Sequence, residues 1–176
     1  MHIKHFFYFL FLMSSISIYP INLLNKKAPH FTASAVFPDG SVDSFNLKDY
    51  LGKKIVLYFY PMDNTPGCSC QAKNFKDNIK KLEDENIVLI GVSCDSINSH
   101  KKFQEKYSLP YILVSDSRIS NSISKMYGVQ SFFMSKRKTF LIDPQGTIFK
   151  KFDKIVIEEQ VDQIITSFQK HESSKK

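Results

Sequence analysis

The sequence has few of the residues that mark non-globular or cross-linked chains. Its 176 residues include no Trp, six Gly and seven Pro, too little Gly and Pro for a collagen-like or other low-complexity chain. Three Cys are too few for a small disulfide-stapled scaffold, and 43% hydrophobic content excludes a disordered polymer. A domain of about 150 residues buries roughly 68–70% of the surface that its unfolded chain exposes, so it folds without a disulfide or a metal. The three cysteines are therefore available for chemistry.

The positive charge of the chain indicates a solvated surface. Its net charge is +7, from 24 Lys and Arg against 17 Asp and Glu. A nucleic-acid or membrane-surface partner would favour basic side chains interleaved with aromatic ones on one face. Here the lysines are scattered singly or in short runs, without that interleaving. We expect no nucleic-acid partner.

The N-terminal segment, residues 1–24, has the order of parts found in a secretory signal peptide. Lys4 precedes the unbroken apolar run Phe6–Met13, and small residues follow at Ser14, Ser15 and Ser17. No charge occurs over the 19 residues of Phe6–Leu24, close to the roughly 20 needed to span a bilayer, so an uncleaved membrane anchor is an alternative. We expect an exported or membrane-anchored protein; a cytoplasmic protein with an apolar extension is the other interpretation.

The rest of the chain alternates between strand and helix patterns, without an internal repeat or a linker. Ile55–Tyr60 and Ile87–Ser93 are continuous β-branched and aromatic runs, typical of strands buried on both faces of a parallel sheet. The pattern predicts an α/β, thioredoxin-like domain over residues 25–170, with a central mixed β-sheet flanked by helices, an N-terminal β-hairpin, and a polar tail at residues 171–176. The other expected elements are a hairpin from Phe31 to Phe45 turning at Pro38–Gly40, an apolar helical stripe from Cys68 to Leu82, helices at Ile97–Tyr107, Ile119–Tyr127 and Ile157–Phe168, and strands at Tyr111–Val114, Thr139–Ile142 and Thr147–Lys151.

The loop after the first buried strand carries the clearest chemical signal. Ligand sites of open α/β sheets lie at the carboxyl ends of such strands. Thr65 followed by Pro66 is typical of a helix N-cap with Pro at the first helical position, which makes Cys68 the third helical residue. The free N–H groups and the positive end of the helix dipole favour a thiolate there, and the thiolate is the nucleophilic form. The alternative interpretation is that Cys68 is a small apolar residue on the buried stripe of the helix.

The same loop resembles the active-site signature of peroxiredoxins. The run from Tyr58 to Cys68 is similar to the peroxiredoxin Q group, also called bacterioferritin comigratory proteins, within the AhpC/TSA family. The family pattern of Pro, three residues, Thr or Ser, two residues and Cys is met by Pro61, Thr65 and Cys68. Further matches extend in the same order over residues 28–168, including Ala28–Phe31, Gly91–Ser93, Ser99-His100, Tyr127–Val129 and Arg137–Asp143.

The resemblance implies a thiol-dependent peroxidase for antioxidant defence and cell redox homeostasis. Its substrates would be hydrogen peroxide or alkyl hydroperoxides, and a sulfenic acid would form on Cys68. Thr65 would hydrogen-bond the peroxide and the thiolate, Pro61 would shield the pocket, and Arg137 would supply a cation, although Arg137 also belongs to the basic run Lys136–Lys138. No prosthetic group is expected, only an external reductant such as thioredoxin or a low-molecular-weight thiol, and the protein would be a monomer or weak homodimer.

The chain departs from the common pattern of the group at the resolving cysteine. That cysteine lies five residues after the nucleophile, where this chain has Lys73, and a Glu three residues after it is replaced by Gln71. Cys70 points about 200° around the helix from Cys68, so a bond between them would need the first turn to unwind. Cys94 ends the neighbouring strand at the same sheet edge and is the better internal candidate, although a buried small residue is its simpler interpretation. We expect a cycle with one essential cysteine.

Two other functions fit the same fold less well. A thioredoxin-like thiol-disulfide oxidoreductase needs two residues between its cysteines, and Cys68-Ser69-Cys70 has one. A copper-binding chaperone needs a cysteine pair and a distant His. His30 precedes the core and His100 begins a helix, so neither is expected to supply a buried third ligand, and no metal site is expected.

Overall fold

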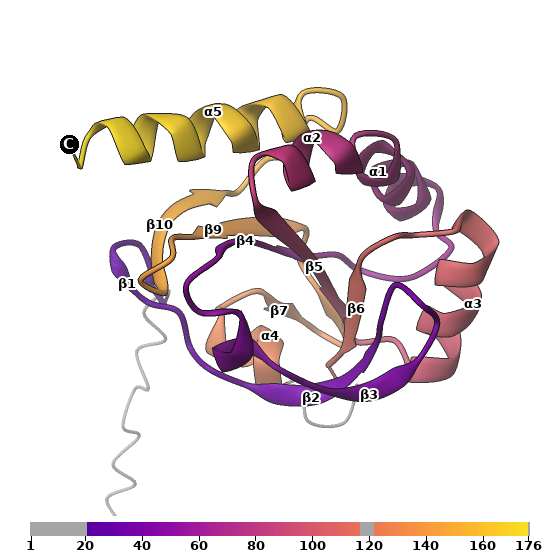
Figure 1. The fold of residues 1–176 in the computed structure, drawn as a ribbon. Helices are drawn as coiled ribbons and strands as arrows, with labels where there is room; N and C mark the ends of the chain where they lie inside the picture. Colours follow the sequence, from indigo (N-terminus) through magenta and orange to yellow (C-terminus); the bar gives the residue numbers. More distant parts are fainter. Residues whose placement is uncertain (1–20, 117–121, 176) are drawn as a thin grey trace, which may run out of the picture.

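A central sheet of eight strands organises the molecule in the computed structural model, which describes residues 21–116 and 122–175. The strand order is β1-β10-β9-β4-β5-β6-β2-β3; β4, β5 and β6 are parallel and the other pairs antiparallel, so the predicted mixed α/β sheet is confirmed (Figure 1). The strands are β1 (Lys26–Lys27), β2 (Thr32–Val36), β3 (Val42–Asn46), β4 (Lys54–Phe59), β5 (Ile87–Ser93), β6 (Ile112–Ser115), β9 (Lys138–Ile142) and β10 (Thr147–Phe152), and β7 (Gln130–Ser131) pairs separately with β8 (Met134–Ser135).

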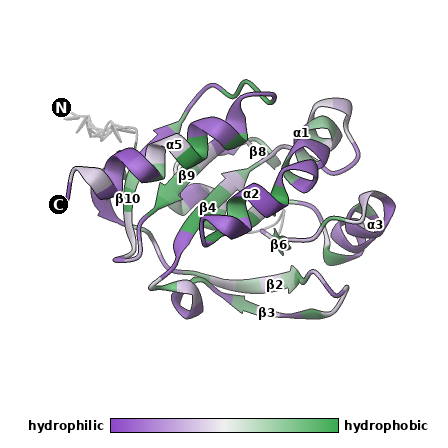
Figure 2. Cartoon of the chain, turned by 45° about the horizontal axis from the view of Figure 1, so that its top comes forward, coloured by the Kyte–Doolittle hydropathy of each residue, from purple (hydrophilic) through white to green (hydrophobic). Residues whose placement is uncertain are grey.

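Helices cover both faces of the sheet, and the sheet separates the core into two apolar layers. One layer joins alternate residues of β4, β5 and β9 to four helices, and it includes Cys68. The other layer packs against α4 and the β2–β3 hairpin. In Figure 2, α5 and α2 lie over the first layer and alternate between hydrophilic and hydrophobic residues, as amphipathic helices do. The helices are α1 (Pro66–Asp77), α2 (Ile79–Asp84), α3 (Ile97–Tyr107), α4 (Ser122–Met126) and α5 (Gln160–Ser173), with a 3-10 turn at η1 (Leu47–Tyr50).

The turns form where the sequence predicts them. Gly40 has φ of +82° in the turn between β2 and β3, and Gly128 has φ of +64° after α4; both values favour glycine. Gly91 has another role, because a Cβ at this position of β5 would lie 2.8 Å from the ring of Tyr58 on β4. The absence of a side chain at Gly91 lets the Tyr58 ring lie flat against the sheet below α1.

Two of the predicted helices have clearly different bounds in the structure. The helix expected from Cys68 to Leu82 breaks at Asn78, whose side-chain amide donates to the Asn74 carbonyl and competes with the helical bonds. The last helix begins at Gln160 and runs to Ser173, because His171 stacks on Phe149 with ring centroids 4.0 Å apart.

The ends of two predicted segments fall on undescribed residues. Most of the proposed leader, residues 1–20, and the start of the helix expected at 119–127 lie outside the described residues. Leu23, which lies in the predicted leader range, packs against the apolar core. Within residues 21–116 and 122–175, no helix is both long and apolar enough to cross a membrane.

Candidate active site

The helix start forms as the sequence predicts, and it buries Cys68. Thr65 has an extended backbone at the N-cap position, Pro66 is the first helical residue, and the Ser69 N–H donates to the Thr65 carbonyl at 2.8 Å. Cys68 is therefore the third residue of α1, and its side chain is 2% exposed. The Thr65 hydroxyl does not cap the helix; it donates to the Met62 carbonyl at 3.1 Å and so fastens the loop to itself.

Arg137 directly precedes β9, the strand next to β4, and its side chain extends to the Cys68 sulfur. The antiparallel register of β9 and β4 pairs Lys138 with Phe59, which places Arg137 at the end of β4 where the loop begins. Its Nη2 donates to Cys68 Sγ at 3.1 Å. The buried sulfur thus accepts a hydrogen bond from a permanent cation at the N-terminal turn of a helix.

Two linked glutamines hold the guanidinium, and no sequence pattern predicts the second. Arg137 Nη1 donates to Oε1 of Gln71, one turn after Cys68, and Gln71 Nε2 donates to Oε1 of Gln160 at 2.8 Å. Both glutamines are buried. A carboxylate at position 71 would neutralise Arg137, whereas the amide accepts its hydrogen bond and leaves its charge for the sulfur. The spacing of Gln71 from Cys68 is a usable signal for its role; Gln160 starts α5, 89 residues further on, and no local pattern links it to the site.

Pro61 lies where the sequence places it, at the start of the loop, and it is half-buried. It follows β4 directly, so its ring lies on the loop that also carries Thr65 and leads to Cys68. The structure therefore brings Pro61, Thr65, Cys68 and Arg137 to one end of β4.

The structure does not bring Cys94 to this site. Cys94 Sγ lies 3.6 Å from the hydroxyl of Ser135 and 3.9 Å from that of Ser124, on the α4 side of the sheet. Cys68 belongs to the apolar layer on the opposite face. Cys94 does share the sheet edge with Cys68, but the sheet separates the two sulfurs. Cys70 is exposed on α1, and none of the three cysteines forms a disulfide with another described residue.

We expect the thiols of Cys70 and Cys94 to react at different rates with iodoacetamide in the native protein. Burial raises the pKa of the Cys94 thiol, and the nearby Asp116 carboxylate raises it further, against the lowering effect of the serine hydroxyls. Cys94 should therefore be alkylated at least about tenfold more slowly than the exposed Cys70 at neutral pH. Peptide mass spectrometry over a time course measures this, with the unfolded protein in guanidinium as the reference. Equal rates for Cys70 and Cys94 in the native protein would contradict the buried position of Cys94.

The described residues do not form the metal site that a copper chaperone needs. Among residues 21–116 and 122–175, no group of three or more His, Cys, Asp or Glu side chains could hold a metal ion. His100 is fully buried. It pairs with Asp63 and not with a cysteine. His30 is exposed.

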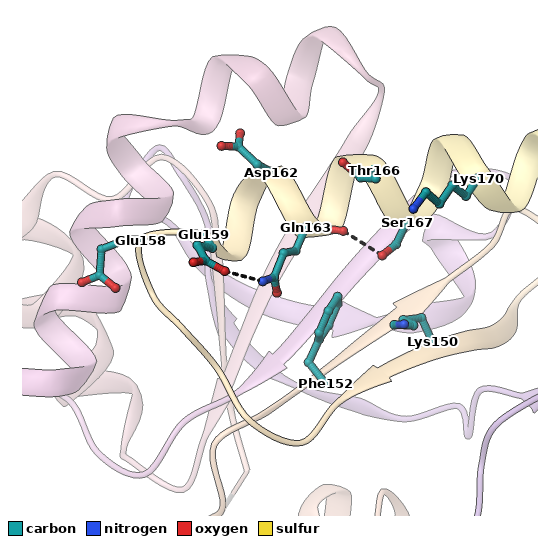
Figure 3. Close-up of a pocket in the computed structure, with 9 residues that line it drawn as sticks. All are labelled: Lys150, Phe152, Glu158, Glu159, Asp162, Gln163, Thr166, Ser167 and Lys170. Carbon is teal, nitrogen blue, oxygen red and sulfur yellow. Dashed lines mark hydrogen bonds between the residues drawn. The ribbon is translucent and has the colours of Figure 1, made fainter.

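A second depression lies between β10 and α5 and has none of these features. Figure 3 shows Phe152 at its floor, with Lys150 and Lys170 near one end and the acidic residues Glu158, Glu159 and Asp162 near the other. Its polar contacts are local to α5: Gln163 donates to Glu159 at 2.8 Å, and Ser167 donates to the Gln163 carbonyl at 2.7 Å. The chemistry of the molecule is therefore centred on Cys68 and not on this groove.

Known proteins are similar to this chain in sequence and in fold. The profile of the AhpC/TSA family matches residues 24–151. A putative peroxiredoxin Bcp of Coxiella burnetii is 35% identical over 150 residues, which are 81% of this chain and 95% of that protein. A chloroplastic peroxiredoxin Q of Gentiana triflora is 38% identical over 136 residues, 76% of this chain and 60% of that protein. The crystal structure of the reduced 2-Cys peroxiredoxin of Plasmodium vivax superposes with a TM-score of 0.76 at 31% identity, covering 86% of this chain and 99% of the other.

Proposed function

The chain belongs to the AhpC/TSA family and is a thiol-dependent peroxidase with the thioredoxin-like fold of peroxiredoxins, and from this premise we propose that Cys68 is the residue that reduces the peroxide. The observation that carries the proposal is the 3.1 Å contact between Arg137 Nη2 and Cys68 Sγ at the first turn of α1. The other two cysteines lack this surrounding, because Cys70 is exposed and Cys94 is buried beside serine hydroxyls.

The reaction is a displacement at the O–O bond of the peroxide. The Cys68 thiolate attacks one peroxide oxygen, so that an S–O bond forms as the O–O bond breaks. The second oxygen leaves with the electron pair and takes a proton, giving water from hydrogen peroxide or an alcohol from an alkyl hydroperoxide. Cys68 is oxidised to a sulfenic acid by two electrons, and the peroxide is reduced by two.

Arg137, Thr65 and Pro61 assist this step in different ways. Arg137 stabilises the thiolate and, from the same guanidinium, can donate to the oxygen on which negative charge develops. The Thr65 hydroxyl donates to the Met62 carbonyl at 3.1 Å, and a hydroxyl rotates freely enough to donate to a bound peroxide instead. Pro61 is half-buried at the start of the same loop, and its role in our proposal is to shield the sulfenic acid from water.

We propose that a thiol from outside the chain resolves the sulfenic acid. The external thiol attacks Cys68 sulfur, an S–S bond forms, and the hydroxyl leaves as water; a second thiol then exchanges with the mixed disulfide and regenerates Cys68. The position of Cys94 on the other face of the sheet favours this cycle with one essential cysteine over an internal disulfide. Thioredoxin or a low-molecular-weight thiol is the proposed reductant.

Non-reducing mass spectrometry after one equivalent of hydrogen peroxide tests this cycle. We expect Cys68 as a sulfenic acid that dimedone traps, with Cys70 and Cys94 still reduced. A quantitative Cys68–Cys94 or Cys68–Cys70 bond would overturn the external cycle. Spectra of protein purified from membrane and soluble cell fractions also give its N-terminus, which tests our proposal that residues 1–24 export or anchor the protein. We also propose that the protein is a monomer or a weak homodimer.

A further inference from the structure

Asp63, in the loop between β4 and α1, is buried, and three side chains form hydrogen bonds to its carboxyl group. Its carboxylate accepts from the Tyr60 hydroxyl at 2.8 Å, from the Ser99 hydroxyl at 2.8 Å and from the His100 ring at 2.9 Å. The side chains of Asp63 and His100 are 1% and 0% exposed. A buried carboxyl group is costly unless its oxygens are hydrogen-bonded, and here three side chains bond to them.

His100 completes this arrangement with its second ring nitrogen. Nε2 lies 3.2 Å from the Val114 carbonyl of β6, while Nδ1 faces Asp63. The ring of His100 thus lies between the Asp63 side chain and the Val114 carbonyl. The Asp63–His100 pair therefore joins the loop to α3 and, through Val114, to the sheet.

The backbone of the loop is fastened at the same point. The Asp63 N–H donates to Oδ2 of Asp95 at 2.8 Å, and that oxygen also accepts from the Ser93 hydroxyl at 2.8 Å, at the end of β5. Side chain and backbone of one loop residue are thus held by α3, β5 and β6 together. The hydrogen bonds described for Asp63 and His100 run to these groups and not to Cys68, so the pair acts on the loop and not in the bond changes.

The buried sulfur makes two opposite demands on this loop. Cys68 is 2% exposed, which suits a small peroxide beside Arg137. The resolving thiol must bring its own sulfur to about 2 Å from Cys68 Sγ, and a side chain buried under the loop and the first turn of α1 does not allow that approach. The loop must be closed for the first step and open for the second.

We propose that the Asp63–His100 pair is the positioning device that holds this loop closed, and that its strength sets the balance between peroxide reduction and thiol resolution. The inference rests on the proposed function of Cys68. Weakening the pair should shift the population toward the open loop, and so slow the peroxide step and speed the thiol step.

The test measures the two half-reactions separately in the full chain. Stopped-flow consumption of hydrogen peroxide by the reduced protein gives the first rate, and the reaction of the pre-formed Cys68 sulfenic acid with 2-mercaptoethanol gives the second. We expect Asp63→Ala, which removes several hydrogen bonds to a charged group, to lower the first rate constant at least about tenfold and to raise the second. Ser99→Ala removes one of those bonds and should move both rates in the same directions by less.

Asp63→Asn is the conservative variant that should restore most of the effect. An asparagine side chain has nearly the same shape and still offers an oxygen or an N–H to the His100 ring, so the loop stays fastened. Its two rates should therefore lie nearer those of the unmodified protein than those of Asp63→Ala. If Asp63→Ala does not fold, Ser99→Ala and Asp63→Asn still decide the question.

Ile148→Val is the matched control, because it removes one buried methyl group from β10 in the apolar layer opposite Cys68. It should lower overall stability and leave both rate constants unchanged. Rates that both fall, or that both stay the same, in the Asp63 and Ser99 variants would overturn the positioning role. Absence of any Cys68 sulfenic acid in the unmodified protein would instead overturn the proposed function, so the two failures are distinguishable.

Discussion

Cys68→Ser is expected to abolish peroxide consumption, with a loss of at least about a thousandfold in the rate constant. The serine hydroxyl is nearly isosteric with the thiol, so the helix start and the Arg137 position should persist. An alcohol is a weak nucleophile without an adjacent general base. Among the described residues no base hydrogen-bonds to the Cys68 sulfur, whose partner is the guanidinium donor of Arg137. Loss of hydrogen peroxide in the presence of excess dithiothreitol measures the effect.

Cys70→Ser and Cys94→Ser are the controls for that result. Each should retain the first turnover, because neither sulfur lies beside Arg137. A circular dichroism melt of all three variants separates loss of chemistry from loss of fold. Peroxide consumption that survives in Cys68→Ser would refute the assignment of the nucleophile.

The second large effect is expected at Arg137. Arg137→Ala removes the donor that is 3.1 Å from the sulfur, and losses of this kind cost about 10²–10³-fold in rate. Arg137→Lys should recover only part of the activity, because one ammonium group cannot reproduce the planar fork that donates to Cys68 and Gln71 together. Single-turnover peroxide kinetics measure both variants.

Lys136→Ala is the matched control for Arg137. Lys136 is the exposed neighbouring cation, and its substitution by Ala removes the same formal charge as Arg137→Ala. Its peroxide kinetics should match those of the unmodified protein if Arg137 acts through contact. A similar loss in both variants would mean that Arg137 contributes only to the general positive field of the surface, and that the short contact has no catalytic part.

The sequence was a good guide wherever a local pattern determines the structure. The runs at Ile55 and Ile87 predicted neighbouring parallel strands, and the register of β4 and β5 confirms it. Thr65 and Pro66 predicted a helix start, and with it the position of Cys68. These features depend on propensity and spacing within a few residues, which a single sequence contains.

Contacts between distant segments were beyond the same reasoning. Cys94 was placed at the correct sheet edge, but β5 is apolar on both faces, so no polar alternation indicated to which face the next residue would point. The Gln71–Gln160 and Asp63–His100 contacts join residues 89 and 37 positions apart, and each depends on how a helix packs on the sheet. The sequence pattern indicates only Pro61, Thr65 and Cys68 in this loop, whereas the hydrogen bonds that fasten the loop to the rest of the fold are made by Asp63.

The order of strands also constrains how the chain is completed during its synthesis. The strands nearest the N-terminus occupy both edges of the sheet: Lys26 in β1 pairs with Ile148 in β10, and β2, which carries β3, pairs Ala35 with Val114 in β6. Such long-range pairings close large loops and fold slowly. Neither edge can be sealed until the ribosome has released the partner strand, and β10 emerges almost last. The short, lysine-bearing β1 then covers an edge that would otherwise remain a template for pairing between unfinished chains.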